Sequence, residues 1–478
     1  MTDQTIIFIT FSAYLAVIFL IGFIAWRNTH NFSDYILGGR KLGSWTTAIS
    51  AGASDMSGWL LLGLPGYAYL AGFETIWIVV GLFLGTTLNW YLVAPRLRVQ
   101  SEQLNNALTL PEYLENRFAD KGHHLRIVSA LLILLFYLFY TSSGLVAGGK
   151  LFESVFGLSY TTAVISGAIT ILIYTGVGGF LAVSWTDLIQ GLLMALALSC
   201  IAIMSVSTLG GITGLTTSLS TQNPELLNAF TTNTGEALGL IGIVSLLAWG
   251  LGYFGQPHIL IRFMAIASST KIPKARRIAL SWTFISLACA LVIGFSGNPL
   301  LGEQLQSGDS EKVFIGLLNL LLHPIPAGIC LAAILAAIMS TADSQLLVAS
   351  SSLTEDIYKT ISPNTSDKKL IFLSRIAVIL ITICATAIAL TPENNVLDLV
   401  AYAWAGFGAT FGPVILVSLF NKTMHKTSAL IGMLSGGITV IVWKNIESTH
   451  VFFALYELVP GFIFSLLAIY LSQLIIKN

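Results

Sequence analysis

The sequence predicts an all-α protein that crosses a membrane many times, and three features of its 478 residues support this fold class. Hydrophobic residues make up 55% of the chain and charged residues only 10%, against roughly 25% charged residues in an ordinary soluble domain. Stretches of about 20 mostly apolar residues, the length that crosses the hydrocarbon core, recur along nearly the whole chain. These stretches are continuously apolar, as in residues 6–26, whereas membrane β-barrels show alternating segments of ~10 residues.

We expect about thirteen membrane helices, each read as an apolar run between polar or Gly/Pro-rich breaks. Their approximate ranges are 6–26, 45–70, 75–95, 125–147, 159–180, 185–207, 236–254, 278–297, 316–342, 371–391, 396–420, 427–444 and 452–475. An odd number of helices places the two termini on opposite sides of the membrane.

The basic residues predict which side is which, because Lys and Arg accumulate in cytoplasmic loops. When successive loops are assigned to alternate sides, all of the 23 basic residues except Lys150, Lys312 and Lys444 fall on one side. This distribution predicts an N-terminus outside and a C-terminus in the cytoplasm. The zero net charge of the whole chain conceals the asymmetry.

Two of the predicted helices are interrupted by glycine and proline. The first interruption is the small and polar segment 50–59, and the second is the segment 249–257. Membrane helices tolerate such breaks only where protein or a water-filled cavity supplies replacement hydrogen-bond partners. Interrupted segments in corresponding positions of two halves point to the binding site of a secondary transporter.

The two interruptions lie five helices apart. Residues 45–207 and 236–420 would therefore form two five-helix units of opposite orientation, flanked by residues 1–44 and 421–478, all within a single transporter domain. The alternative is that the glycines only let helices pack closely. Close packing does not explain the carboxylate of Asp55 between the glycines of the first interruption.

Asp55 is the residue that most strongly indicates function. A charge near the bilayer centre costs from ~2.5 to over 10 kcal/mol, depending on the measure, and usually marks a functional site. Carbonyl groups freed by the break, together with hydroxyls such as that of Ser57, could complete an all-oxygen shell for a hard cation. Ala337, Ser340 and Thr341 share one face of the ninth predicted helix, near its end, and could supply further oxygens.

Several polar positions keep two interpretations. Ser340 and Thr341 could bond back to their own helix, and Asp343 could do no more than shape the helix end. Asp187 follows Ser184 at the spacing of a capping box at the start of the sixth helix, so its functional role is an open alternative.

Aromatic residues flank both interruptions. Trp249 and Tyr253 are four residues apart just before the second break, and Trp59 flanks the first. Together they could enclose a small apolar ring, although such residues also serve as packing or interfacial anchors. Tyr140, whose hydroxyl needs a partner when buried, is a candidate contact or gate.

At these positions the chain resembles the sodium/solute symporter family, and within it the branch of bacterial sodium/proline symporters. Segments 34–40, 178–187 and 339–345 are similar to the wider family, while the Asp55 segment and residues 252–258 are similar to the proline branch. The resemblance spans almost the full length and also includes residues 107–111 and 401–408. It implies a leucine-transporter-like inverted repeat of five plus five helices, with extra helices at both ends.

The resemblance also implies roles for individual residues. It implies a sodium site between the second and ninth helices, formed by Ala53, Met56, Ala337, Ser340 and Thr341. Asp55 would support sodium binding and closure, and Ser57 and Gly58 would line the place where ion and proline meet. The implied proline pocket consists of Trp59, Tyr140, Trp249, Tyr253 and Pro257. Coupling or accessory roles fall to Arg40, Asp187 and Asp343.

The implied function is sodium-coupled import of L-proline across a bacterial cytoplasmic (inner) membrane by alternating access. Sodium would be the co-transported ion, and no organic cofactor, nucleic acid or obligate protein partner is expected. Another small amino acid or a carboxylate is the main alternative substrate. A channel would expose a continuous polar stripe, and an enzyme would need a nucleophile or a metal set. The polar residues instead cluster at the two breaks and one helix end, without a recognisable spacing of acids with His or Cys.

Overall fold

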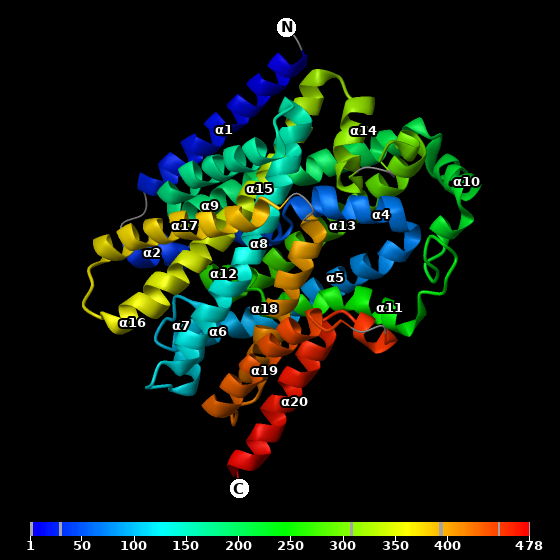
Figure 1. Ribbon diagram of the computed structural model, residues 1–478. Coiled ribbons are helices and arrows are strands. Elements are labelled where there is room, and N and C mark those ends of the chain that lie inside the picture. Colours follow the sequence, from blue (N-terminus) through cyan, green and yellow to red (C-terminus); the bar gives the residue numbers. More distant parts are fainter. Residues whose placement is uncertain (1–2, 28–30, 306–308, 392–394, 448–449, 478) are drawn as a thin grey trace.

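A computed structural model describes the whole chain apart from residues 1–2, 28–30, 306–308, 392–394, 448–449 and 478. The described residues are almost entirely helical (Figure 1), with two isolated β-bridges as the β-structure found among them. Ten of the helices in this part are long and apolar enough to cross a membrane, or eleven when one bent pair is counted as a span. The predicted class, an all-α protein with many membrane spans, is confirmed.

The helices of the N-terminal part have the following bounds: α1 (Asp3–Arg27), α2 (Phe32–Leu37), α3 (Ser44–Asp55), α4 (Leu64–Ala71), α5 (Ile76–Leu88), α6 (Ala94–Gln103), α7 (Leu110–Phe118), α8 (His124–Phe156), α9 (Tyr160–Thr208) and α10 (Gly211–Gln222). Those of the C-terminal part are α11 (Gly239–Leu247), α12 (Pro257–Ala265), α13 (Ile272–Leu301), α14 (Val313–Leu321), α15 (Pro324–Ser351), α16 (Lys359–Ile361), α17 (Asp367–Ala389), α18 (Val396–Phe420), α19 (Lys426–Lys444) and α20 (Leu458–Lys477).

The first predicted interruption separates α3 from α4. Helix α3 ends at Asp55, and the backbone leaves helical geometry at Met56 (φ −81°, ψ 78°). A short turn with wider π-helical hydrogen bonding, η2 (Trp59–Gly63), then leads into α4. The predicted break in the second span is confirmed.

The second predicted interruption separates η6, a 3₁₀ segment (Ala248–Gly255), from α12. Gln256 is extended (φ −79°, ψ 107°), and Pro257 opens α12 at a position where its missing N–H costs nothing. The axes on the two sides of Gln256 differ by 45°. This break is confirmed as well.

Two predicted helices, 159–180 and 185–207, are joined in the single long helix α9. A kink at Gly179 (φ 63°, ψ −174°) separates the two halves. A Cβ at this position would lie 2.8 Å from the ring of Tyr35, so the kink needs glycine both for its backbone geometry and for this contact.

The prediction of one helix over 316–342 is wrong in its bounds. Helix α14 ends at Leu321, and α15 begins at Pro324, a favoured first residue of a helix. Helix α15 runs to Ser351 and is followed by a further helical segment to Ile361. Residues 337–345 therefore lie in the interior of α15 instead of at its end.

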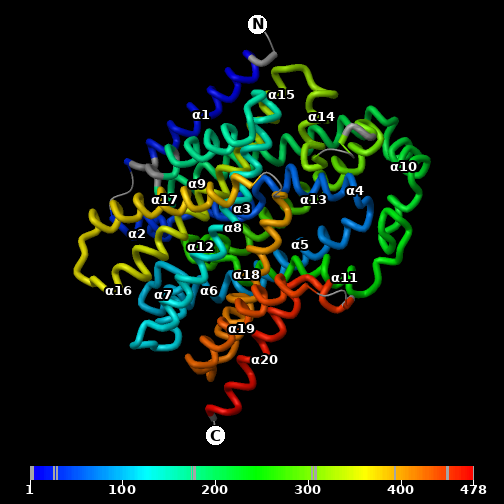
Figure 2. Tube along the Cα trace, in the orientation of Figure 1, coloured from blue at the N-terminus to red at the C-terminus, as the bar shows by residue number. Residues whose placement is uncertain are grey.

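Burial separates central helices from peripheral ones. The apolar windows of α15 and α18 are 83% and 89% buried, whereas that of α1 is 17% buried. Helix α1 accordingly runs along one side of the molecule (Figure 1), and the start of α1 and the end of α20 lie at opposite ends in both views (Figure 2). The two broken helices, α3–α4 and η6–α12, pack against this central group.

Candidate functional site

Asp55 is the meeting point of three predicted pocket residues. Its backbone carbonyl accepts hydrogen bonds from the indole Nε1 of Trp59 (3.0 Å) and the hydroxyl of Tyr140 (3.2 Å). Its carboxylate Oδ2 accepts the hydroxyl of Tyr253 (2.8 Å). All four residues are buried, so the structure brings the carboxylate and these aromatics together in a site closed to solvent.

One oxygen of this carboxylate is not used by the protein. Asp55 Oδ1 has no hydrogen-bond partner among the residues that the structure describes. A buried carboxylate oxygen without a partner is costly, and it calls for a ligand or another explanation. A small enclosed cavity beside Asp55, between Gly52, Trp90 and Thr283, adjoins the carboxylate.

Four predicted sodium-site residues also lie together. The hydroxyls of Ser340 (2.8 Å) and Thr341 (3.2 Å) on α15 both donate to the carbonyl of Ala53 on α3. Ser340 also lies 3.1 Å from the carbonyl of Ala337, one turn earlier in its own helix. The expected back-bonding and the expected contact with the broken helix therefore coexist.

The oxygens of this arrangement could also serve as cation ligands. A hydroxyl oxygen both donates and accepts, so rotating its proton away exposes a lone pair. The carbonyls of Ala53 and Ala337 with the hydroxyls of Ser340 and Thr341 then present the oxygen set that a hard cation prefers. Met56, the remaining predicted ligand, is buried at the end of α3 and donates its own N–H to the carbonyl of Gly52 (2.8 Å).

The break itself packs tightly against α8. Ser57 is buried, and its hydroxyl lies 3.4 Å from the backbone N–H of Trp59. A Cβ added to Gly58 would lie only 2.6 Å from the Cβ of Ala147 on α8. Gly58 therefore lets the first break approach α8 closely, which a larger residue would prevent.

The two aromatics of the second break have different surroundings. Tyr253 reaches Asp55 and meets the ring of Trp404 edge-on at 5.0 Å. Trp249 is buried, stacks on Tyr456 at 5.6 Å, and its carbonyl accepts the indole N–H of Trp404 (2.7 Å). The predicted pocket therefore contains Tyr253 in direct contact with Asp55, while Trp249 lies one turn away. Pro257 is buried at the first turn of α12.

The most connected side chain near the site was missed by the sequence interpretation. Arg262, assigned there to the cytoplasmic loops, is fully buried in α12 and pairs with Asp187 of α9 (3.2 Å). Its guanidinium also donates to Ser50 of α3 (3.1 Å), Ser344 of α15 (2.5 Å) and the carbonyl of His258 (2.7 Å). An arginine inside the apolar run 257–265 was the available signal, the same kind of signal that singled out Asp55.

The capping-box interpretation of Asp187 is wrong. The residue lies deep inside α9, is fully buried, and accepts the hydroxyl of Ser50 (2.6 Å) in addition to Arg262. Its ion pair and this hydrogen bond therefore link α9 with α12 of the second broken helix and with α3 of the first. This arrangement joins Asp187 to the site through Ser50, five residues before Asp55.

The idea that Asp343 shapes a helix end is also wrong. Asp343 is fully buried in the interior of α15, where its Oδ1 accepts the hydroxyl of Thr175 on α9. Its Oδ2 has no hydrogen-bond partner in the described part of the chain. Asp343 is thus another buried carboxylate with an unpartnered oxygen, two residues beyond Thr341.

Arg40 fastens the segment before α3 to the last turn of α12 and to the segment between α6 and α7. Its guanidinium donates to the carbonyls of Met264 (2.5 Å) and Ala107 (2.8 Å) and to the side chain of Asn106 (2.7 Å). Burial, and next the nearby charge of Arg98, lower the pKa of Arg40 to about 10, so it stays charged at neutral pH.

A second set of bonds closes the same side. The backbone N–H of Leu42 donates to the carbonyl of Ala265, and that of Ala267 donates to the carbonyl of Leu42 (3.0 Å). Arg98 on α6 donates to the carbonyl of Ile266 (2.6 Å). The start of α3 and the end of α12 are therefore tied together, and this side of the site is closed.

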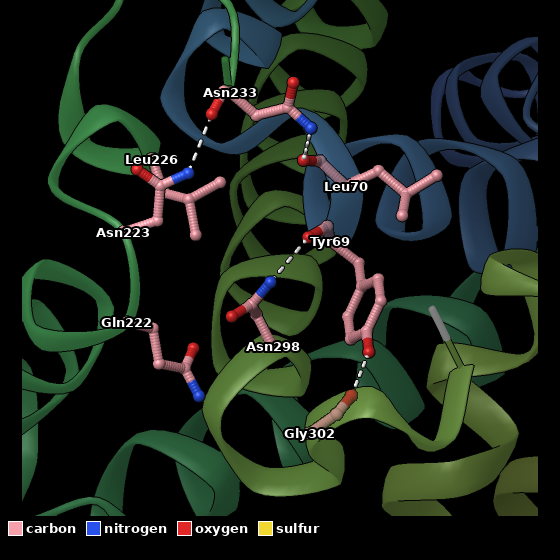
Figure 3. Close-up of a pocket in the computed structure, with 8 residues that line it drawn as sticks. All are labelled: Tyr69, Leu70, Gln222, Asn223, Leu226, Asn233, Asn298 and Gly302. Carbon is pink, nitrogen blue, oxygen red and sulfur yellow. Dashed lines mark hydrogen bonds between the residues drawn. The ribbon is translucent and has the colours of Figure 1, made fainter. Parts of the chain in front are cut away.

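The other end of the first broken helix is fastened by amides. Figure 3 shows a polar pocket of about 470 Å³ at the end of α4. There Asn298 of α13 donates to the carbonyl of Tyr69 (2.9 Å), Asn233 donates to that of Leu70 (3.0 Å), and the Tyr69 hydroxyl bonds to Gly302. The two amide bonds satisfy carbonyls at the end of α4, so these amides act as caps for that helix. The pocket is separate from the Asp55 site.

Comparison with known sequences identifies relatives over almost the whole chain. The family model described as the sodium:solute symporter family matches residues 35–436. The chain is 50% identical over 487 residues to a sodium/proline symporter of Escherichia coli (strain K12), covering 100% of this chain and 94% of that protein. It is 48% identical over 458 residues to the high-affinity proline transporter PutP of Bacillus subtilis (strain 168), covering 95% of each.

Solved structures with the same fold are more distant in sequence. A Na⁺-coupled sialic acid symporter in a substrate-bound outward-open state superimposes with a TM-score of 0.80 at 20% identity, over 98% of both chains. Mhp1, a nucleobase-cation-symport-1 family transporter, gives a TM-score of 0.57 at 14% identity over 93% of this chain and 94% of its own. At these identities the likeness shows the fold alone.

Proposed function

The chain belongs to the sodium:solute symporter family, and on this premise we propose that it imports L-proline together with sodium across the bacterial cytoplasmic membrane by alternating access. The family is one of transporters, so the protein is not an enzyme. Curated relatives about 50% identical over the full length are sodium/proline symporters, which supports proline as the substrate.

The geometry around Asp55 is the observation that carries the proposal. Its carboxylate is bonded to Tyr253 and its carbonyl to Trp59 and Tyr140, while Ala53, two residues earlier, accepts the hydroxyls of α15. One stretch of unwound backbone thus borders an oxygen-rich position on one side and aromatic rings on the other. A ligand bound on either side would contact the same few residues of this stretch, which is a structural basis for coupling two ligands.

The proposed sodium ligands are the backbone carbonyls of Ala53, Met56 and Ala337 and the hydroxyls of Ser340 and Thr341. The proposed proline pocket is lined by Ser57, Gly58, Trp59, Tyr140, Trp249, Tyr253 and Pro257. Asp55 lies between the two and supplies negative charge through its unpartnered oxygen. Arg40, Asp187 and Asp343 are proposed to act in coupling and closure, in keeping with their positions around the two broken helices.

The finer architecture is proposed on the same basis. Residues 45–207 and 236–420 would be two inverted five-helix units of a leucine-transporter-like fold, and the flanking segments would bring the number of helices to about thirteen. The bonds of Arg40 and Arg98 would then close the cytoplasmic side, with the N-terminus outside and the C-terminus in the cytoplasm. Sodium would be the co-transported ion.

Uptake by the purified protein in liposomes tests the proposal. An imposed inward sodium gradient should drive accumulation of labelled proline. One charge moving through 100 mV supplies about 2.3 kcal/mol, so voltage alone could sustain roughly fortyfold accumulation. Uptake that persists without sodium and stops on addition of a proton uncoupler would refute the ion assignment.

A competition panel tests the substrate. Unlabelled proline should displace labelled proline more strongly than other small amino acids or carboxylates at equal concentration. Stronger displacement by another compound would replace proline with that compound and leave sodium coupling intact.

A further inference from the structure

A groove on the surface of the helix bundle lies outside the site described above. It has a volume of about 590 Å³ and is formed by α3, α9 and α13. Most of its wall is apolar, with Ile49 of α3, Leu192 of α9 and Ile278 of α13 among the lining residues. Two cationic residues, Lys274 and Arg277, lie at one end.

The two cations are available to a ligand. Both side chains are exposed, and neither makes a hydrogen bond or an ion pair with any described residue. Residues 268–277 contain four basic residues and no acidic one. The end of the groove therefore carries positive charge that the described part of the protein does not neutralise.

The position of the groove relates it to the membrane surface. Trp45 also lines it and is 53% exposed, as is typical of the aromatic belt at the headgroup level. The cationic end would lie at the cytoplasmic surface in the proposed orientation, and the apolar wall would lie toward the acyl chains. Basic pockets between membrane helices on this side suit anionic lipid headgroups.

We propose that this groove binds one anionic phospholipid of the cytoplasmic leaflet, with its headgroup on Lys274 and Arg277 and an acyl chain along α3, α9 and α13. The inference rests on the proposed orientation but not on proline as the substrate. A phospholipid matches both parts of the groove, the unpaired cations and the apolar wall, whereas a free phosphate would match only the first.

The groove also touches the first broken helix. Trp282, which lines the groove, holds its ring against Gly52 of α3, where a Cβ would lie 2.6 Å from the ring. The hydroxyl of Ser44, the first residue of α3, donates to the carbonyl of Lys271 (3.1 Å) beside the cationic end. A lipid bound here thus contacts the back of the helix that carries Asp55, and it is expected to alter the rate of transport.

The test measures lipid binding to the full-length protein by native mass spectrometry. Delipidated protein is titrated with phosphatidylglycerol or with phosphatidylcholine of the same acyl chains. Each basic residue at an anionic surface contributes about fivefold to binding, so the K274Q/R277Q variant should bind phosphatidylglycerol about 25-fold more weakly. The K121Q/K422Q variant makes the same change of charge at two exposed loop positions outside the groove and should bind like the unaltered protein.

A second variant tests the apolar part. A195W places a large ring in the groove while leaving both cations, and it should also reduce binding of phosphatidylglycerol. Unchanged binding by K274Q/R277Q, unchanged binding by A195W, or equal retention of phosphatidylcholine and phosphatidylglycerol would each overturn the proposal.

Proteoliposomes add a functional measurement. Adding phosphatidylglycerol to phosphatidylcholine should change the rate of uptake by the unaltered protein and by K121Q/K422Q, and this response should be absent in K274Q/R277Q. A full response in K274Q/R277Q would remove the link between the groove and transport. Failure of the protein to take up proline would refute the proposed substrate and would leave the binding result standing.

Discussion

The two broken helices satisfy their freed backbone carbonyls with different donors. In the first, the carbonyl of Ala53 accepts two hydroxyls, those of Ser340 and Thr341. In the second, the indole N–H of Trp404 donates to the carbonyl of Trp249. The side-chain amide nitrogen of Gln256 lies 3.1 Å from the carbonyl oxygen of Gly252. Both breaks therefore avoid the cost of unpaired backbone groups.

The difference in donors has a chemical consequence. A hydroxyl can turn its proton away and present a lone pair to a cation, whereas an indole or amide N–H has no such lone pair. The donors of the first break could therefore be exchanged for a cation, as the proposed sodium site requires. The second break keeps its carbonyls covered.

The charges of the two breaks differ as well. The first carries Asp55, whose Oδ1 has no partner among the described residues, and the second carries Arg262, whose donors reach three helices and its own backbone. This contrast fits the proposed division of roles, with ion binding at the first break and closure of the cytoplasmic side at the second. Four variants, each with a control, test this division, beginning with the largest expected effect.

Asp55→Asn tests the charge of the first break. The amide keeps an oxygen for Tyr253 but loses the negative charge. At ~4 Å and an effective dielectric constant of ~20, that charge attracts a cation by about 4 kcal/mol, or roughly a thousandfold. We expect sodium-dependent proline uptake in liposomes to be almost abolished.

Asp398→Asn is the control for this change, since Asp398 is an exposed acidic residue in the first turn of α18. It should transport normally. Normal sodium dependence in Asp55→Asn would return this carboxylate to a structural role and remove the distinction between the breaks.

Arg262→Met tests the charge of the second break. The substitution leaves the fully buried Asp187 without its ionic partner, a change that typically costs about 3 kcal/mol or more. We expect a large fall in the thermal unfolding temperature of the detergent-purified protein.

The double variant Arg262→Met with Asp187→Asn separates the ion pair from packing. Removing the orphaned carboxylate should recover much of the lost stability. A double variant no more stable than Arg262→Met would show that the guanidinium acts through its bonds to Ser50 and Ser344 instead.

Ser340→Ala with Thr341→Ala tests the exchange of hydroxyls for a cation. Both changes leave the Ala53 carbonyl in place and remove two side-chain oxygens. We expect the sodium concentration for half-maximal uptake to rise about tenfold, because the variant loses one or two ion contacts that are each about as strong as a hydrogen bond. The affinity for proline at saturating sodium should change little.

Ser350→Ala is the matched control, because its hydroxyl bonds to the carbonyl of Leu347 in the same helix. Sodium dependence should be unaltered there. An equal shift in Ser350→Ala and in the double variant would show that α15 responds to any loss of a hydroxyl.

The sequence predicted the first break better than the second, for a physical reason. A carboxylate between glycines in an apolar span is costly in any packing arrangement, so Asp55 could be singled out without a structure. The face shared by Ala337, Ser340 and Thr341 follows from helical periodicity, and the structure indeed turns this face toward Ala53. Such local signals survive the packing of the helices.

What the sequence could not predict depends on contacts between distant elements. The side-chain partners of Arg262 lie 75 to 212 residues away along the chain, and no local pattern specifies the rotation of four helices that brings them together. The burial of Asp343 was missed because the predicted helix ended at residue 342, before the end of α15 at Ser351, which made an interior position look like a helix end. The pairing of Asp187 was missed for a related reason, since the two halves of α9 were read as separate helices.

Trp59→Phe gives the smallest expected effect and tests whether the substrate side of the first break can be altered without altering its ion side. The carbonyl of Asp55 accepts the Trp59 indole and the Tyr140 hydroxyl, so one of these two donors is an N–H, whereas both side-chain donors to the carbonyl of Ala53 are hydroxyls. Phenylalanine keeps an aromatic ring and removes one hydrogen bond, worth about 1 kcal/mol or roughly fivefold. We expect proline affinity to fall by about this factor while sodium dependence is kept.

Trp77→Phe is the control, because Trp77 loses the same kind of bond, from its indole to the carbonyl of Ala229 (2.7 Å), away from the break. Proline affinity should be unchanged in that variant. A shift of sodium affinity in Trp59→Phe as large as that of the Ser340 and Thr341 double variant would mean that the Asp55 carbonyl also exchanges its donors for the ion. The boundary between the ion side and the substrate side of the first break would then lie beyond Asp55. The presence of hydroxyl donors would no longer be enough to tell which carbonyls bind the ion.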